Sequence, residues 1–291
     1  MIPIKSLVTT SGLLLACVAS AHAEALSWEI DSGFSGVADS RFKGPSTHGD
    51  VKAADFGFRA VASAPTRGGP LVRAGFDWQR FNFVLPESAL LPNTLQSLAL
   101  VVGADFQAGE AWLFRLEAMP GLYAGNTDFR LESFNVPVIL GGSYFVSADL
   151  QLIAGIEVDF NARYPVLGAV GLRWKFAPDF VLNAVLPNPR IEYNYGKALT
   201  FYAGGDIRTA TYRVDSDFGR AHGLPRLGNS IIDYTQIRLG GGASWSVNSN
   251  LTLEMEAGVV PIQEFDFHRA GVNVKSDGTP AYGAISLKAK F

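Results

Sequence analysis

Apolar and polar residues alternate along most of this chain with a period of two. In the segment 150–161, one alternate set is apolar from Leu150 to Phe160, and the other set contains Glu157 and Asp159. Because successive side chains of a β-strand point to opposite faces, such a segment forms a strand with one apolar and one polar face. The alternation therefore predicts an all-β protein whose strands each meet two different environments.

The same alternation recurs in further segments, which are 112–118, 170–176, 199–208, 236–246 and 251–259. A soluble β-sandwich also alternates, but it does not usually place charges on one face and a continuous apolar band on the other in strand after strand. Transmembrane barrels do so because lipid surrounds the outer face while the interior is polar. We therefore expect a closed, antiparallel, up-and-down transmembrane β-barrel.

Composition supports a membrane protein without spanning helices. Hydrophobic residues make up 48% of the 291 residues, and the formal net charge is −3. After residue 23, no segment runs for ~18 apolar residues without interruption, as a spanning helix requires. Only helices and closed barrels satisfy every backbone polar group in lipid, so a barrel is the expected spanning structure. The near-neutral charge also argues against a nucleic-acid partner.

The alternating segments define about fourteen strands, an even number of the kind that bacterial barrels favour. The predicted strands are 26–38, 50–63, 71–84, 95–106, 110–121, 133–146, 150–161, 166–176, 180–187, 190–195, 199–214, 232–247, 251–264 and 280–291. We interpret Pro187-Asn188-Pro189 as a tight outer turn, because proline does not serve a central ladder. If this tripeptide is a kink within one strand, the number falls. Twelve is then the main alternative, and sixteen is the lesser one.

Connections of two lengths separate the predicted strands. Short turns occur at 147–149, 177–179, 196–197 and 247–250, and the longer polar connections are 42–50, 85–94, 123–132, 215–230 and 265–279. Short turns at one end and long loops at the other are typical of outer-membrane barrels, in which the short turns are periplasmic. With an even number of strands, this asymmetry predicts that both termini are periplasmic.

The first residues resemble a secretory signal peptide. Lys5 precedes a short apolar core at residues 7–19, and Ala21-His22-Ala23 forms a small-x-small cleavage site. The apolar core is shorter than the ~20 residues of a spanning anchor. Residues 1–23 are therefore predicted to be a cleaved leader, and residues 24–291 a single barrel domain. Lipoprotein processing at Cys17, the only cysteine in the sequence, is the alternative.

The final predicted strand resembles the assembly signal of bacterial outer-membrane barrels. Ile285, Leu287, Ala289 and the terminal Phe291 occupy one alternating face. In the barrels that this strand resembles, the barrel-assembly machinery reads an alternating strand that ends in an aromatic residue. The resemblance implies that machinery as a partner, outer-membrane lipid as the surroundings, and the bacterial outer membrane as the location.

Residues 24–291 as a whole resemble bacterial outer-membrane barrel families, including an uncharacterised family with no assigned activity. Residues 189–193 and 199–205 are similar to a hairpin of porins and long-chain fatty-acid transporters. The transporter resemblance would imply an N-terminal plug, but strand-like alternation at Trp28 and Ile30 leaves no room for one. The resemblance therefore implies an architecture and does not identify a solute.

Charges of both signs fall on the predicted interior face. The candidate pore-lining residues are Arg115, Glu117, Glu157, Asp159, Arg173, Lys175, Asp206, Arg208, Arg238, Glu254, Glu256 and Lys288. They could form a wet pore with a transverse field, or a ladder of ion pairs that closes the lumen. The leading hypothesis is a non-enzymatic, narrow passive channel for small solutes or a route for hydrophobic compounds with lateral exit. The first alternative is a plugged barrel with a structural or surface-interaction role.

Three histidines fall in predicted outer loops. They are His48, His222 and His268, and the last has Glu264 and Asp266 nearby. Such a group suits a metal site or an acid–base pair, which leaves a barrel-rim hydrolase of the lipase or protease type as a second alternative. We expect ordinary solvated loops here, with no catalytic residue, metal or cofactor.

We interpret one glycine-rich stretch as structural. Gly240-Gly241-Gly242 lacks the Lys-Ser/Thr pair of a phosphate-binding loop, so we expect it to relieve crowding within a strand. The sequence specifies neither the solute nor the oligomeric state.

Overall fold

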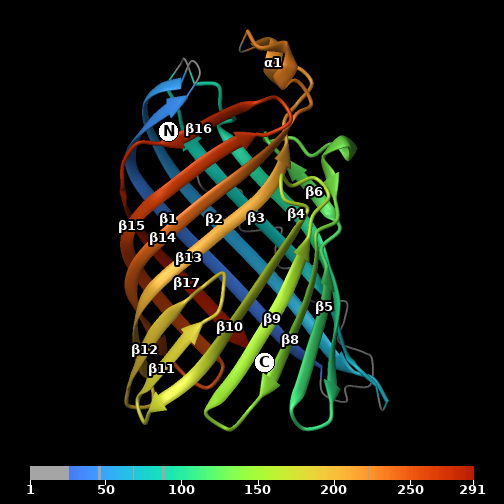
Figure 1. The fold of residues 1–291 in the computed structure, drawn as a ribbon, viewed down its shortest axis with the longest axis vertical. Coiled ribbons are helices and arrows are strands. Elements are labelled where there is room, and N and C mark those ends of the chain that lie inside the picture. The colour runs from blue at the N-terminus through green and yellow to red at the C-terminus, as the bar shows by residue number, and fades with distance from the viewer. Residues whose placement is uncertain (1–25, 45–46, 68, 87–88, 222) are drawn as a thin grey trace, which may run out of the picture.

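The computed structural model describes residues 26–44, 47–67, 69–86, 89–221 and 223–291. Within them, one sheet closes on itself because β1 pairs with both β2 and β17 (Figure 1). Fourteen antiparallel strands form the wall, which confirms the predicted fold and strand number and rules out twelve or sixteen. The predicted leader, residues 1–23, lies outside the described residues.

The wall strands lie close to their predicted positions. They are β1 Ser27–Gly44, β2 Thr47–Pro65, β3 Leu71–Val84, β4 Thr94–Ala108, β5 Trp112–Ala118, β8 Val138–Phe145, β9 Leu150–Val158, β10 Val166–Ala177, β11 Phe180–Ala184, β12 Arg190–Tyr195, β13 Leu199–Arg213, β14 Ile231–Ser246, β15 Leu251–Phe267 and β17 Ala281–Lys290. The short elements are β6 Gly121–Ala124, β7 Phe134–Asn135, β16 Val272–Ser276, α1 Phe218–Ala221, η2 Leu131–Ser133 and η3 Pro225–Leu227.

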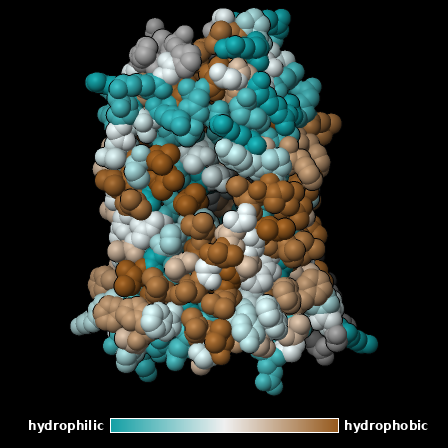
Figure 2. Space-filling view, in the orientation of Figure 1, coloured by the Kyte–Doolittle hydropathy of each residue, from teal (hydrophilic) through white to brown (hydrophobic). Residues whose placement is uncertain are grey.

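An apolar band covers the outside of the wall. Leu152 and Ile156 of β9 are about two-fifths exposed on the outer face. Glu157 of the same strand belongs to the inner set and is partly buried, as the alternation predicts. Figure 2 shows brown residues spread over the middle and lower part of this face and a teal upper end. Exposed apolar surface on this scale marks contact with lipid or a partner. Among the described residues, none of the helices has the length and apolarity needed to cross a bilayer.

Short turns gather at one end of the barrel, which is the lower end in Figure 1. The described ends of the wall meet there, because Trp28 and Phe291 exchange backbone hydrogen bonds of 2.9 and 3.0 Å. Two connections predicted as long loops at the other end are instead largely strand. β1 and β2 extend into the segment 42–50, and β16 occupies part of the segment 265–279. Inward packing of Phe42 and pairing of Phe265 with Val274 explain these extensions.

The two faces of the sheet exchange character at the upper end. Phe265 and Phe267 of β15 are fully buried in the interior, while Glu264, just before Phe265, lies outside and pairs with Lys275 at 3.1 Å. An apolar interior and a polar exterior are what a water-surrounded protein requires. The upper end is therefore built like a soluble barrel, and the lower and middle parts like a membrane-embedded one.

Aromatic rings fill the interior at this upper end. The five rings that form this aromatic section are Phe42, Phe81, Phe83, Tyr234 and Phe265, and all are at least 95% buried. Neighbouring ring centroids lie 4.9 to 5.8 Å apart for Phe81–Tyr234, Phe83–Phe265 and Phe42–Phe265, distances at which aromatic pairs attract. Leu91, from the connection between β3 and β4, is buried in the same cluster.

The wall is incomplete on one side. The β11–β12 hairpin turns at residues 185–189, well below the upper rim, and β10 pairs with it only from Leu172. On the other side, the N–H groups of Gly205 and Ile207 in β13 donate to the carbonyls of Pro189 and Pro187. Above the hairpin, β10 and β13 therefore flank an opening in the wall, and Figure 2 shows a hollow at this place. The prediction that Pro187-Asn188-Pro189 forms a turn is confirmed.

Candidate functional site: a charged chamber inside the barrel

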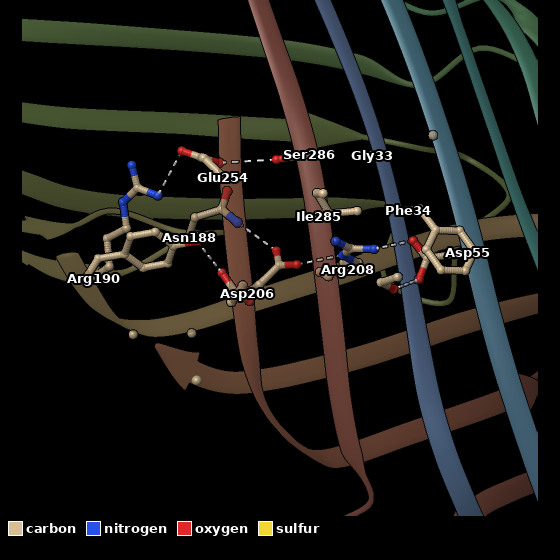
Figure 3. A pocket seen from close by; sticks show the side chains of 18 of the residues that line it. Gly33, Phe34, Asp55, Asn188, Arg190, Asp206, Arg208, Glu254, Ile285 and Ser286 are labelled. Atoms are coloured by element: carbon tan, nitrogen blue, oxygen red, sulfur yellow. Dashed lines mark hydrogen bonds and ion pairs between the residues drawn. The ribbon is translucent and has the colours of Figure 1, made fainter. Parts of the chain in front are cut away.

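A cavity of about 490 Å³ lies inside the barrel below the aromatic section. We call it the chamber; Figure 3 shows many of its lining side chains. Its charged lining residues are Asp55, Arg190, Asp206, Arg208, Glu254, Glu256 and Lys288. Asn183 and Asn188 of the β11–β12 hairpin also line it, so the chamber extends to the side of the wall where the opening lies.

Glycines on the inner face leave the chamber its room. Gly33, Gly57 and Gly204 line it without side chains. At Gly242, a Cβ atom would lie 2.6 Å from the Tyr202 ring, and at Gly240 it would lie 2.6 Å from the Tyr282 hydroxyl. Both distances are below any normal van der Waals contact, so these two positions accept only glycine while the tyrosines lie against the wall. The structural interpretation of the Gly240–Gly242 stretch fits this geometry.

An ion-pair network crosses the barrel at the top of the chamber. Arg238 of β14 donates from Nη2 to Asp55 Oδ1 of β2 at 2.7 Å and to the Ser35 hydroxyl at the same distance. Arg208 of β13 reaches the other oxygen of Asp55 at 2.8 Å and Asp206 at 2.6 Å. Four strands separate β13 from β2 around the wall, so these contacts span the lumen. Arg238 is only 1% exposed at its side chain, so its charge depends on these partners.

Other charged groups at the lower end pair along the wall. Arg59 donates to Glu117 Oε1 at 2.5 Å, and Arg73, which is 4% exposed, contacts Glu29 at 3.1 Å. Arg115 makes a bidentate ion pair with Asp105, with hydrogen bonds of 2.7 and 2.8 Å. These pairs join β1 to β5 and cover this part of the interior with compensated charge.

The structure distributes the twelve predicted pore-lining residues over several places. Asp206, Arg208, Glu254, Glu256 and Lys288 line the chamber. Arg238 lies in the network above it, and Arg115 and Glu117 belong to the lower pairs. Arg173 lies 3.8 Å from Glu192 and Lys175 is exposed, while Glu157 and Asp159 line a second pocket of about 100 Å³ between β9–β10 and β13–β14.

Several residues of the site were not predicted. Asp55 and Arg59 stand on one alternate set of β2, with Phe56 and Phe58 on the other, so the same period-two argument could have found them. Tyr202 lies on the same alternate set as Asp206, and Tyr282 on the same set as Lys288, so alternation places both on the inner face; they were missed because only charged residues were taken as pore-lining candidates. The side-chain ion pair between β13 and β2 across the lumen has no signal in the sequence.

The histidines do not assemble a catalytic group in the described part of the chain. His268 Nδ1 lies 3.2 Å from Asp233 Oδ2, and no hydrogen bond joins a serine hydroxyl to it among the described residues. His222 lies outside those residues, and nothing is described of the His48 side chain. The described residues contain no group of three or more potential metal ligands from His, Cys, Asp and Glu.

A closed antiparallel wall with an apolar outer band and a charged interior defines a transmembrane β-barrel. No family model matches the chain, and no curated protein matches it. Solved barrels are similar in fold. They include an outer membrane channel from Pseudomonas putida F1 (TM-score 0.47, 11% identity, covering 94% of this chain and 98% of that one). The toluene transporter TodX of Pseudomonas putida (0.40, 10%, 92% and 90%) and the KdgM porin in complex with oligogalacturonate (0.37, 9%, 90% and 99%) are further examples. Likeness at this level says nothing about the solute of this chain.

Proposed function

We propose that the protein is an outer-membrane barrel that provides a narrow passive route for small polar solutes. The observation that carries this proposal is the chamber, a cavity of about 490 Å³ lined by carboxylates, guanidinium groups and an ammonium group inside an otherwise lipid-facing wall. Buried charges are costly unless they are paired or hydrated, so a polar cavity of this size favours water and polar solutes. Passage needs no covalent chemistry, and we propose a non-enzymatic role.

The aromatic section lies directly above the chamber along the same strands. Val37 follows Ser35 on the inner face of β1, and Tyr234 lies two inner positions beyond Arg238 on β14. Solutes that leave the chamber upward must therefore pass rings that are almost fully buried. We infer that this section restricts passage.

Swelling of proteoliposomes tests the proposal. Purified protein is reconstituted and challenged with glycerol, alanine, arabinose and raffinose at equal osmotic strength. The proposal expects entry of the smallest solutes and exclusion of raffinose. If heat-modifiable, folded protein gave no swelling with any of the four, the passive route would be wrong, and the plugged barrel with a structural or surface role would stand in its place.

A second candidate is a route for hydrophobic compounds through the side opening. Apolar residues line the β10 side of this opening, where Val166, Leu167 and Val170 are 60%, 45% and 80% exposed. Leu167 and Thr209 line the second pocket from the two sides of the opening. A bismaleimide linker between Leu167→Cys and Thr209→Cys would close it. This candidate expects the linker to stop uptake of a hydrophobic fluorophore and to leave glycerol uptake unchanged; equal fluorophore uptake with and without the linker would contradict it.

The location and orientation are also proposals. We propose insertion in the bacterial outer membrane with the short turns and both termini on the periplasmic side, after recognition of the strand ending in Phe291 by the assembly machinery. The arrangement of β17 suits this, because Ile285, Leu287 and Phe291 are exposed on the outer face and Ala289 is nearly buried. Membrane fractionation together with labelling of an Asn248→Cys turn in intact cells tests it: labelling from outside would contradict the orientation.

A further inference from the structure

The charges that line the chamber are not all compensated. Asp55 pairs with Arg208 and Arg238, Asp206 pairs with Arg208, and Glu254 lies 2.8 Å from the Lys288 ammonium. Glu256 differs from these three carboxylates. Among the described residues, no lysine or arginine nitrogen lies within 4.0 Å of its oxygens. The chamber therefore presents one carboxylate without a cationic partner.

Two tyrosines hold this carboxylate in place. The Tyr202 hydroxyl donates to Glu256 Oε2 at 2.9 Å, and the Tyr282 hydroxyl donates to Oε1. Phenol hydroxyls stabilise the charged form without neutralising it, and a carboxylate can accept about two hydrogen bonds more than these. Glu256 thus remains able to accept hydrogen bonds from a group inside the chamber.

Two guanidinium groups lie over the rings of these same tyrosines. The Arg190 guanidinium lies 4.8 Å from the centroid of the Tyr202 ring, and the Arg238 guanidinium lies 5.0 Å from that of Tyr282. Each arginine also has its own carboxylate, Glu192 for the first and Asp55 for the second. Both guanidinium groups therefore contact a tyrosine ring and a carboxylate of their own, and neither pairs with Glu256.

We propose that Glu256 is the binding point in the chamber for the ammonium group of a small organic cation. This inference rests on the proposed passive route and names the class of solute that the route favours. An ammonium group supplies N–H donors for the free acceptor positions of Glu256 and a positive charge, which no lysine or arginine among the described residues supplies within 4.0 Å of this carboxylate. Attraction between unit charges is stronger in a cavity of this kind than in bulk water.

Planar-bilayer recordings in a KCl gradient test the inference, with methylammonium chloride as the probe. The wild type is expected to prefer cations, and methylammonium is expected to reduce the potassium current. Glu256→Gln removes the charge and keeps the size, so it should shift the reversal potential toward zero or beyond. It should also weaken inhibition by methylammonium about tenfold or more, as the loss of a hydrogen bond to a charged group implies. Glu264→Gln, on the outer face beside Lys275, is the matched control and should behave like the wild type.

The outcomes separate this inference from the proposed function. If the wild type conducts and Glu256→Gln retains both the selectivity and the inhibition, the inference is overturned while the passive route stands. A wild type that is folded but does not conduct overturns both. If Glu256→Gln does not fold to a heat-modifiable state, the inference is tested on the wild-type protein by the following comparison. Inhibition by methylammonium but not by equal concentrations of potassium acetate supports the inference, and equal inhibition by both overturns it.

Discussion

Arg238 and Asp55 are 183 residues apart in the chain and face each other across the barrel, with Nη2 and Oδ1 2.7 Å apart. Both side chains are nearly inaccessible to water, with exposed fractions of 1% and 9%. A pair of this kind does little for stability when it is exchanged as a whole, but removing one partner takes charge-assisted hydrogen bonds from a buried group. The pair thus fixes the distance between β2 and β14, which three strands separate around the wall, at the top of the chamber.

Arg238→Met should lower the free energy of unfolding by about 1.5–3 kcal/mol, because the hydrogen bonds of Arg238 to Asp55 and Ser35 are lost while Arg208 still pairs with Asp55. Urea unfolding in detergent micelles, followed by tryptophan fluorescence, measures the change. Arg220→Met is the control, since Arg220 pairs with Asp217 in an exposed segment and its loss should change stability by less than ~0.5 kcal/mol. Equal midpoints for the two variants would contradict the role given to the cross-lumen pair.

The aromatic section should limit the current. Phe265 is fully buried and contacts Phe42, Phe83 and Tyr234. Phe265→Ala is expected to cost about 3–5 kcal/mol of stability through the cavity it leaves, and to raise single-channel conductance because the same cavity widens the path. Phe201→Ala, on the lipid-facing side of β13, removes an equal side chain without touching the interior. A conductance that rises equally in both variants, or in neither, would argue against this restriction.

Neighbouring residues of β9 should respond oppositely to a charge. Leu152 is 43% exposed on the outer band, and Gln151 lies on the inner face. Leu152→Arg should destabilise the inserted barrel by about 2–4 kcal/mol if it lies near the bilayer midplane, because lipid does not solvate the guanidinium. Gln151→Arg should be tolerated. The folded fraction of each variant in lipid vesicles is read from its heat-modifiable migration. A lower folded fraction for Gln151→Arg than for Leu152→Arg would mean that Gln151, and not Leu152, faces the lipid.

Arg163 ties the loop between β9 and β10 to the outer face of the upper wall through two contacts. Arg163 Nη1 contacts Asp266 Oδ2 at 2.6 Å, and its backbone N–H donates to Asp233 at 2.8 Å. The hydrogen bond and the charge of Asp266 raise the pKa of Arg163, so its guanidinium group is charged at every physiological pH. Arg163→Ala should speed amide hydrogen exchange in residues 159–164 and leave β3 unchanged. Unaltered exchange in the loop would show that the Arg163 contacts do not hold it in place.

Alternation allowed the strands to be predicted because two solvents act on alternate residues of each strand. The segment 150–161 is a clear case, since the lipid-facing and inward-facing sets are both correct there. The same argument does not tell inside from outside. At the upper end the alternation of Glu264, Phe265 and Asp266 is as regular as below, yet the apolar side chain faces inward, and this region was predicted in part as a loop.

The site could be predicted only in part. Residues such as Asp206 and Glu254 were found because each lies on a polar alternate face, which is a property of one strand. The meeting of Arg238 with Asp55, and the short β11–β12 hairpin that leaves the wall open, depend on the barrel's diameter and on where strands end. Neither quantity is encoded in the period of a single segment.

Labelling of cysteines placed on β17 tests the central claim most directly, because residues 24–291 contain no cysteine. Ser286 lines the chamber beside Glu254, and the neighbouring Leu287 is 42% exposed on the outer band. The protein is reconstituted in vesicles and exposed to a charged, membrane-impermeant methanethiosulfonate. We predict that Ser286→Cys is modified and that its conductance falls, while Leu287→Cys stays unmodified. Protection of position 286 in the folded protein, or equally fast modification at 287, would contradict a water-filled chamber within a lipid-facing wall.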